Sequence, residues 1–339
     1  MSTEKLTGGG IALRGEKVLI TGAGGFIGSH LTEEVVRAGA DVVALVRYNS
    51  GGRWGNLETL DPEALRSVKV VAGDVRDGEF IRSILKGRTV VFHLAALVAV
   101  PYSYRSPASY VATNVEGTLN VLQAALDLGI ERVVHTSTSE VYGTAAYVPI
   151  DEAHVLQAQS PYAASKIAGD KLAESFHRSF GLPVVTVRPF NAFGPRQSAR
   201  AIVPTIATQA MAGDRVRLGN LTPVRDLCFV TDTVRGFVLA AKAPAAVGQV
   251  INLCTGVGVS VGDLVEKILK VVGVRAEVQV DSERVRPEAS EVGKLIGSAA
   301  RAERLLAWTP LVSLEEGLSR TVGWLRGHAD RYKADVYNV

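Results

Sequence analysis

The chain has 339 residues, of which 47% are hydrophobic and 21% are charged, an ordinary globular composition that excludes a disordered protein. Its length suits one large domain or two modest ones. The 37 basic and 34 acidic residues leave a net charge of +3, a near-balance that gives no support for a nucleic-acid or membrane partner.

Short apolar runs alternate with longer amphipathic stretches through the first part of the chain. We predict strands at 17–21, 41–46, 68–73, 89–96, 132–138 and 183–189. We predict helices at 26–39, 79–87, 106–129 and 160–181. Continuous Val/Ile-rich strands separated by helices indicate a parallel sheet with both faces covered. The sequence therefore predicts an α/β fold with a doubly wound, Rossmann-type parallel sheet.

After the sixth strand the elements become shorter and prolines separate them. We predict one more strand at 249–255 that returns to the main sheet, and amphipathic helices at 261–273 and 313–327. We therefore expect a Rossmann domain at 16–190, which carries the cofactor and catalytic residues. A smaller, mainly substrate-binding cap is expected at 191–330.

The cysteines bear on metal binding, and the apolar runs bear on the location of the protein in the cell. Cys228 and Cys254 are far apart and lack the spacing of a zinc motif or a disulfide framework, so no metal site is expected. Residues 1–17 contain no apolar core of a signal peptide. No run of ~18 uncharged apolar residues predicts a membrane span. We therefore expect a cytoplasmic protein.

The segment ITGAGGFIG places Gly22, Gly25 and Gly28 between the first strand and the first helix. Glycines allow a tight turn and a close approach of the backbone to a ligand, and the helix N-terminus can then face a pyrophosphate. A glycine triplet by itself can be a plain turn. Its position between these two elements favours dinucleotide binding.

The end of the second strand bears on the choice between NAD and NADP. An NAD site usually has an acidic residue there, which binds the ribose 2′-hydroxyl. Here Arg47 ends the strand, Arg53 follows, and no carboxylate is present. Arg47 can pair with a 2′-phosphate, so NADP is slightly favoured, and a solvent-facing arginine is the alternative. Asp74, after the third strand, is a candidate acceptor for the adenine amine or else a helix cap.

Tyr162 and Lys166 are four residues apart on a predicted helix, so their side chains lie on one face. An ammonium near a phenol lowers the pKa of the phenol from ~10. This spacing is common by chance, and a surface pair is the alternative interpretation. The dinucleotide loop and the run of hydroxyl residues at 136–139, one strand upstream, favour a catalytic pair.

Five segments occur together in the order that is typical of one enzyme family. They are TGAGGFIG (21–28), HLAA (93–96), TSTSEVYG (136–143), SPYAASK (160–166) and VRPFNAFGPRQ (187–197). Over roughly residues 16–327 the chain resembles the extended short-chain dehydrogenase/reductase family, and more narrowly its nucleotide-sugar 4,6-dehydratases, which are lyases. The resemblance implies tightly bound NAD(P) that is recycled in each turnover, and a catalytic triad of Thr138, Tyr162 and Lys166.

The resemblance also implies the surroundings of cofactor and substrate. Besides the glycines and the Tyr–Lys pair, the implied cofactor residues are Phe26, Ile27, Arg47, Asp74, Val75, Leu94, Ala95 and Ala96. The diphosphate of the nucleotide sugar is expected near Asn191, Arg225 and Arg286, because an arginine fork suits phosphate; a turn asparagine and surface salt bridges are the alternatives. Relatives often dimerise as a four-helix bundle, here through helices 106–129 and 160–181. His93 is expected to be structural.

Glu140 follows the triad threonine at the end of a buried strand, where an unpaired charge is costly. Most epimerases of the family lack an acid here, whereas the dehydratases have one. The resemblance implies that Tyr162 takes the 4-hydroxyl proton while hydride leaves C4. A base must then remove the C5 proton and an acid must help the C6 hydroxyl leave, and one carboxylate can serve both steps. We interpret Glu140 as that carboxylate; a partner for a buried arginine is the alternative.

Ser139, the residue before Glu140, bears on which dehydratases of the family the chain resembles most. Ser139 stands where dTDP-glucose dehydratases have aspartate, and Thr-Ser-Glu resembles the GDP-mannose dehydratase pattern, so Ser139 joins the catalytic candidates. The segments 137–154, 188–213 and 284–292 look closest to dehydratases that act on UDP- or GDP-linked N-acetylglucosamine, such as those of the legionaminic acid type. The alternatives are a UDP-glucuronate decarboxylase, a nucleotide-sugar 4-epimerase and a non-catalytic dinucleotide-binding regulator.

Overall fold

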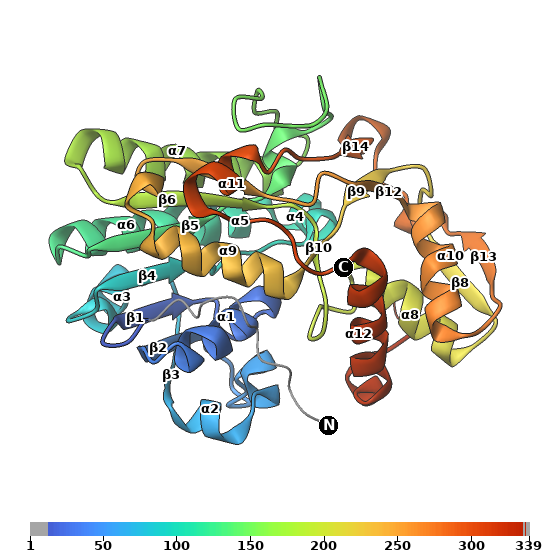
Figure 1. Cartoon of the computed structure of the whole chain (residues 1–339), viewed down its shortest axis with the longest axis horizontal. Helices are drawn as coiled ribbons and strands as arrows, with labels where there is room; N and C mark the ends of the chain where they lie inside the picture. Colours follow the sequence, from blue (N-terminus) through green and yellow to red (C-terminus); the bar gives the residue numbers. More distant parts are fainter. Residues whose placement is uncertain (1–12, 335, 337–339) are drawn as a thin grey trace.

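A parallel sheet of seven strands forms the centre of the computed structural model, which describes residues 13–334 and 336 (Figure 1). The strands are β1 (Lys17–Thr21), β2 (Asp41–Arg47), β3 (Val68–Gly73), β4 (Val90–His93), β5 (Arg132–Thr136), β6 (Val184–Pro189) and β11 (Val250–Leu253). Their order is β11-β6-β5-β4-β1-β2-β3, and all neighbouring pairs are parallel, which confirms the predicted fold class. The order reverses between β1 and β4, and such reversals are where doubly wound sheets bind ligands.

Helices cover both faces of this sheet. One layer contains α1 (Phe26–Arg37), α9 (Val230–Lys242) and α11 (Ala300–Leu306). The other contains α3 (Gly78–Leu85), α6 (Gly117–Asp127) and α7 (Pro161–Phe180). Successive side chains of a strand face opposite layers, so Val18 and Ile20 of β1 lie in the first core and Leu19 lies in the second. Because both faces are apolar, the strands read as continuous apolar runs.

The helix α7 begins and ends at residues that are typical of helix termini. Ser160 accepts a hydrogen bond from the Ala163 N–H at 3.1 Å, and Pro161 occupies the first position, where no N–H is needed. Gly181 ends the helix in the left-handed conformation, with φ of 71°. These signals place Tyr162 in the first turn of the helix and Lys166 one turn later.

The predicted helix 106–129 is not a single α-helix. It consists of α5 (Pro107–Tyr110), a π-helical segment (Val111–Glu116) and α6. Within the π segment, Asn114 accepts from the Leu97 N–H at 2.8 Å and donates to the Leu97 carbonyl at 2.9 Å. The π segment thus joins this helix to the chain that follows β4, a contact that the periodicity could not indicate.

The chain after β6 is divided between the sheet and a separate group of elements. That group contains α8 (Ile202–Ala212), β8 (Arg215–Leu218), α10 (Val261–Val272), β13 (Glu277–Val280) and α12 (Leu314–Arg326), which lie together beside the sheet (Figure 1). A second small sheet joins β12 (Gly258–Ser260), β9 (Val224–Asp226) and β14 (Lys294–Leu295), and short strands β7 (Ala192–Phe193) and β10 (Cys228–Phe229) pair with each other. The strand β11 pairs with β6, and α9 and α11 pack on the main sheet, so this half of the chain builds part of the Rossmann sheet as well as the cap.

Two expectations concern membrane-spanning helices and a signal peptide. None of the helices that the structure describes combines the length and the apolar character needed to cross a bilayer. The expected lack of a signal peptide concerns residues 1–17, most of which lie outside the described residues.

Candidate active site

The loop between β1 and α1 requires glycine where the sequence has it. Gly22 has φ of 69°, and a Cβ there would lie 2.7 Å from the Ala95 nitrogen. A Cβ at Gly28 would lie 2.2 Å from the Gly22 oxygen. The helix α1 begins after Gly25 with Phe26 and Ile27, with no side-chain cap and no acidic residue in its first turn. Its first N–H groups therefore suit the pyrophosphate of a dinucleotide.

The segment after β4 lies against this glycine loop. The Thr21 hydroxyl accepts from the N–H groups of Leu94 and Ala95, each at 3.1 Å. His93 contacts the Thr21 hydroxyl at 2.8 Å and the Thr118 hydroxyl at 3.0 Å. Burial holds the pKa of His93 well below its usual value, so the ring is neutral. These contacts support the expected structural role of His93.

The end of β2 presents one arginine without an ion pair. Arg53 pairs with Glu58 at 2.7 Å, which occupies its guanidinium. Arg76 donates to both oxygens of Asp74 and, as the largest cause, holds the pKa of that carboxyl below its usual value; the charge of Arg47 contributes to the same shift. Among the described residues, the exposed Arg47 guanidinium has no hydrogen bond or ion pair. Of the two arginines, Arg47 is the one available to a 2′-phosphate.

The Tyr–Lys pair is buried beside the end of β5. Tyr162 and Lys166 are 7% and 4% exposed. Burial raises the pKa of Tyr162 above its usual value, and the nearby Thr138 hydroxyl partly opposes this. Burial also lowers the pKa of Lys166 to about 8. The expected lowering of the phenol pKa by Lys166 is therefore wrong for the protein chain alone, where burial dominates and the ammonium donates to the Thr136 carbonyl.

Glu140 faces the same site from a short 3₁₀ helix (Ser139–Tyr142) that follows Thr138. The Glu140 N–H donates to the Thr138 hydroxyl at 3.2 Å. The Glu140 carboxylate is half-buried and has no hydrogen bond or ion pair within the part of the chain that the structure describes. Its charge raises the pKa values of both Tyr162 and Arg225. The structure thus brings the carboxylate, the phenol and this guanidinium into one site, with Ser139 buried at its edge.

Two of the three predicted phosphate-binding residues have a buried donor without a partner. The side-chain nitrogen of Asn191 and one terminal nitrogen of Arg286 are buried without a hydrogen-bond partner. Burial and the charge of Glu140 have the largest influence on the pKa of Arg225. The charge of Arg286 comes next and lowers this pKa, so the two guanidinium groups lie near each other. The ion pair that Arg225 forms is with Glu291, at 3.6 Å, and not with Glu140. Two neighbouring guanidinium groups, of which Arg286 has a buried nitrogen without a partner, suit a diphosphate.

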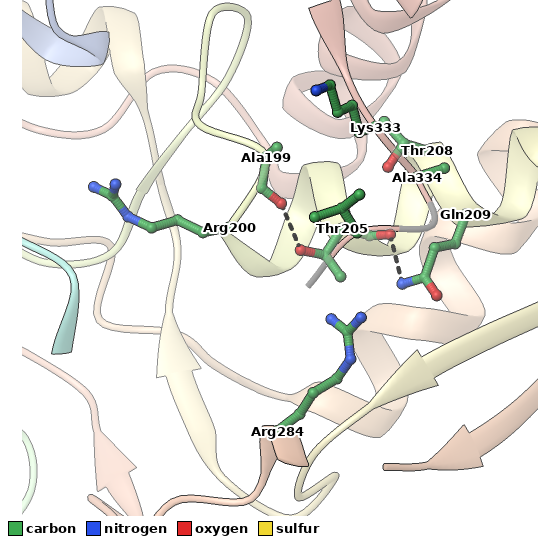
Figure 2. A pocket seen from close by; sticks show the side chains of 9 residues that line it. Ala199, Arg200, Thr205, Thr208, Gln209, Arg284, Lys333 and Ala334 are labelled. Carbon is green, nitrogen blue, oxygen red and sulfur yellow. Dashed lines mark hydrogen bonds between the residues drawn. The ribbon is translucent and has the colours of Figure 1, made fainter. Parts of the chain in front are cut away.

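Sequence reasoning missed Arg200, which precedes α8. Figure 2 shows that its side chain extends away from Thr205, Gln209 and Arg284, with which it lines a pocket. Among the described residues its guanidinium has no hydrogen bond or ion pair, and its charge lowers the pKa of Tyr162. Nothing in the local sequence distinguishes this arginine from a surface residue.

A second missed residue is Asn114, in the π-helical segment. Its side-chain nitrogen donates to the Ser165 hydroxyl at 2.9 Å, and that hydroxyl donates to the Tyr162 carbonyl at 2.7 Å. Asn114 therefore links the segment after β4 to the helix turn that carries Tyr162. An asparagine four residues after a tyrosine on a helix gives no sequence signal of this kind.

Comparisons with known proteins show the family to which the chain belongs. The family model described as GDP-mannose 4,6 dehydratase matches residues 19–321. The dTDP-glucose 4,6-dehydratase of Streptomyces antibioticus is 35% identical over 320 residues, which cover 91% of this chain and 92% of that one. The UDP-glucose 4-epimerase of Mycolicibacterium smegmatis is 33% identical over 316 residues, which cover 91% and 98%. The crystal structure of DesIV, a dTDP-glucose 4,6-dehydratase from Streptomyces venezuelae with NAD bound, is similar with a TM-score of 0.84 and 31% identity over 94% and 99% of the chains. The chain therefore belongs to the family of NAD-dependent nucleotide-sugar dehydratases and epimerases, and it is an enzyme of that family.

Proposed function

We propose that the enzyme is a nucleotide-sugar 4,6-dehydratase, which converts a nucleoside diphosphate hexose to the 4-keto-6-deoxy sugar. The observation that carries this proposal is the half-buried Glu140 carboxylate, which has no ion pair among the described residues and shares a site with Tyr162. A 4-epimerase moves protons and hydride only at C4 and needs no second base. A dehydratase must also remove the C5 proton, which requires a carboxylate in this position.

The residues of the site divide the proton transfers between them. Tyr162 takes the proton of the sugar 4-hydroxyl, and Thr138 orients the phenol. A bound NAD(P), held by the glycine loop and the N-terminus of α1, would accept hydride from C4 and later return it to C6. Glu140 removes the C5 proton, which the 4-ketone makes acidic, and then protonates the departing C6 hydroxyl, which leaves as water. C5 then takes up a proton from solvent as C6 gains hydride, and Tyr162 releases to solvent the proton that it took from the 4-hydroxyl. Ser139, buried beside Glu140, is assigned to this same step.

The substrate proposed is UDP- or GDP-linked N-acetylglucosamine. Asn191, Arg225 and Arg286 would bind its diphosphate. The unpaired donors of Asn191 and Arg286 and the neighbouring charges of Arg225 and Arg286 support this role. The preference for this sugar rests on the resemblance of segments 137–154 and 188–213 to dehydratases of the legionaminic acid type. The reaction is proposed to take place in the cytoplasm.

NADP is proposed in preference to NAD. The exposed Arg47 has no ion pair among the described residues, while Arg53 is paired with Glu58. No carboxylate stands at the end of β2 to bind a ribose 2′-hydroxyl. Asp74 remains the candidate for the adenine amine, although both of its oxygens already accept from Arg76.

One observation favours a second candidate function, a UDP-glucuronate decarboxylase. Arg200 lies near Tyr162 without an ion-pair partner among the described residues. A guanidinium in that position suits a sugar carboxylate at C6, which N-acetylglucosamine does not have. The decarboxylase would begin with the same oxidation at C4 and then lose carbon dioxide.

A panel of nucleotide sugars, read by mass spectrometry, tests these candidates. Loss of one water from UDP- or GDP-N-acetylglucosamine supports the proposal, and loss of carbon dioxide from UDP-glucuronate supports the alternative. A change of configuration without a change of mass indicates an epimerase. Binding without turnover of any sugar would indicate a dinucleotide-binding regulator and contradict the proposal. If the enzyme is a decarboxylase, Arg200→Ala should weaken turnover of UDP-glucuronate far more than turnover of the neutral sugar nucleotide. If it is a dehydratase, this difference should be absent. Arg217→Ala, on the exposed face of β8, is the control.

A homodimer through the two long helices is also proposed. Val111 and Leu119 are 49% and 39% exposed on the segment that runs from α5 to α6, which leaves apolar surface available for a second copy. Light scattering should give twice the chain mass of 36.0 kDa. Leu119→Arg should yield monomers, whereas Leu311→Arg, at an exposed position outside these helices, should not. A dimer that survives Leu119→Arg unchanged would contradict this interface.

A further inference from the structure

A buried ionic cluster lies behind the Tyr–Lys pair, and it consists of Asp170, Arg188, His135 and Ser137. Arg188 of β6 donates two hydrogen bonds to one Asp170 oxygen, at 2.9 and 3.1 Å. His135 of β5 contacts the other oxygen at 3.2 Å. The Ser137 hydroxyl donates at 2.8 Å to the same oxygen that Arg188 binds. All four side chains are at most 4% exposed. One carboxylate therefore joins α7, β5 and β6.

This cluster contacts both parts of the proposed catalytic apparatus. Asp170 lies four residues after Lys166 on α7, so the two side chains share a face of the helix. Ser137, which donates to Asp170, directly precedes Thr138. The Asp170 carboxylate thus links the residue before the threonine to the helix that carries the phenol and the ammonium.

The cluster also holds the far end of the segment that carries Glu140. Arg188 donates to the Tyr142 hydroxyl at 2.9 Å and stacks on the same ring, with its guanidinium carbon 4.9 Å from the ring centre. The Tyr142 hydroxyl donates to the Asn252 side-chain oxygen at 2.7 Å. Tyr142 is the last residue of the 3₁₀ helix, so Glu140 lies between two anchored points.

The charges of the cluster act on Lys166. Burial, the largest influence, would raise the pKa of Asp170, but hydrogen bonds from His135 and Ser137 and the charge of Arg188 lower it to about 2. The charge of Asp170 favours the ammonium form of Lys166, against the effect of burial. The other titratable groups that face Lys166 are His93 of β4 and His135 of β5, and burial lowers both of their pKa values, so both are neutral. Asp170 is the anion that acts on this ammonium.

A buried ion pair is weak evidence for a stabilising role, because desolvation of both charges commonly offsets their attraction. We propose that Asp170 is a positioning residue: its carboxylate holds the Lys166 ammonium and the Ser137–Tyr142 segment in the arrangement that the proton transfers require. The expected effect of Asp170 on turnover rests on the proposed function. Its effect on the protonation of Lys166 is a property of the protein without substrate and does not rest on that function.

The first test follows the titration of Lys166 by nuclear magnetic resonance and needs no substrate. The ¹³Cε resonance of Lys166, in protein labelled at lysine, is assigned by its loss in Lys166→Met. In Asp170→Asn its midpoint should fall by about 1 to 3 pH units, because a buried opposite charge is lost. Asp170→Glu should restore most of the shift. Glu174→Gln, which removes an exposed carboxylate one turn further along α7, should leave the midpoint unchanged. An unchanged midpoint in folded Asp170→Asn would overturn the proposal.

The second test uses turnover of whichever nucleotide sugar the wild-type enzyme accepts. Ser137→Ala removes one anchor while it keeps the Asp170–Arg188 pair, so it applies even if Asp170→Asn does not fold. Its kcat should fall on the order of 10²-fold with KM within about twofold, because loose positioning affects the reacting geometry and not binding. In Asp170→Asn the alkaline limb of the kcat profile should move to lower pH. A wild-type kcat in Ser137→Ala would contradict the positioning role, whereas failure of the wild type to process any sugar would contradict only the proposed function.

Discussion

The Lys166 ammonium donates a hydrogen bond of 2.5 Å to the main-chain oxygen of Thr136, two residues before Thr138. The contact ties α7 to the end of β5 and fixes the turn that carries Tyr162. Burial acts on Tyr162 and Lys166 in opposite directions, since it raises the pKa of the phenol and lowers that of the ammonium to about 8. At neutral pH the phenol is therefore held in its neutral form, while Lys166 remains mainly an ammonium. Arg200, whose charge lowers the pKa of the phenol, has no ion pair among the described residues.

Tyr162→Phe should abolish the first proton transfer. The substitution keeps the ring and removes the proton acceptor, so turnover should fall by at least the ~10²–10⁴-fold that general acid–base catalysis contributes. Dinucleotide binding should persist. Tyr102→Phe, at a 40% exposed tyrosine that packs near Tyr110, is the matched control and should retain activity. Near wild-type turnover in Tyr162→Phe would remove this residue from its proposed role.

The bound dinucleotide should be NADP and should remain with the protein through purification, because each turnover reduces and reoxidises it. Denaturation followed by mass spectrometry identifies the released nucleotide. Arg47→Ala should shift the occupancy toward NAD, since Arg47 is the residue proposed to supply the charge for a 2′-phosphate. Recovery of NAD alone from the wild type would identify Arg47 as a surface residue.

Acid should destabilise the protein through His30. This residue of α1 lies 2.9 Å from the Pro195 carbonyl, and burial together with the charge of Arg196 lowers its pKa to about 4. The unfolded chain, with a histidine pKa near 6.5, takes up the proton first as pH falls. The free energy of unfolding should therefore decrease between about pH 6.5 and pH 4, by roughly 3 kcal/mol from this group.

Urea unfolding at several pH values, compared between the wild type and His30→Gln, isolates this contribution. The variant should be less stable at neutral pH but should lose less stability as pH falls through the window. The same pH dependence in both proteins would show that His30 does not couple protonation to the packing of α1 against the loop after β7.

The sheet and α7 could be predicted because their signals are local. Val/Ile-rich strands, Ser160, Pro161 and Gly181 act within a few residues of where they stand. The π-helical segment could not be predicted, because it depends on the contact between Asn114 and Leu97. The short strands and helices of the cap likewise depend on partners that are distant in the sequence.

Some residues of the candidate site could likewise be predicted from the sequence, and others could not. Gly22, Tyr162 and Glu140 could be singled out from motifs, and the structure places them at the glycine loop and around the end of β5. Asp170 could not, because a carboxylate on an amphipathic helix indicates a surface charge until its partner Arg188 is known to come from β6. The phenol pKa was expected to be low because spacing shows the lysine but not the burial that outweighs it.

Glu140→Gln tests the second proton step. The variant keeps the size of the side chain and removes the base, so oxidation at C4 should proceed while elimination stops. Reduced nicotinamide should then accumulate and absorb in the near ultraviolet. Glu131→Gln, at the exposed start of the same strand region, is the matched control and should turn over normally.

The most direct measurement is the fate of hydrogen in the wild-type reaction with UDP- or GDP-N-acetylglucosamine in heavy water. The proposed function predicts one deuterium at C5 of a 4-keto-6-deoxy product, and a label placed on C4 of the substrate should reappear on C6 of the same molecule. Glu140→Gln should incorporate no deuterium. A product that keeps its C6 oxygen and takes no deuterium at C5, or dehydration by Glu140→Gln at the wild-type rate, would contradict the role of Glu140 on which the account depends.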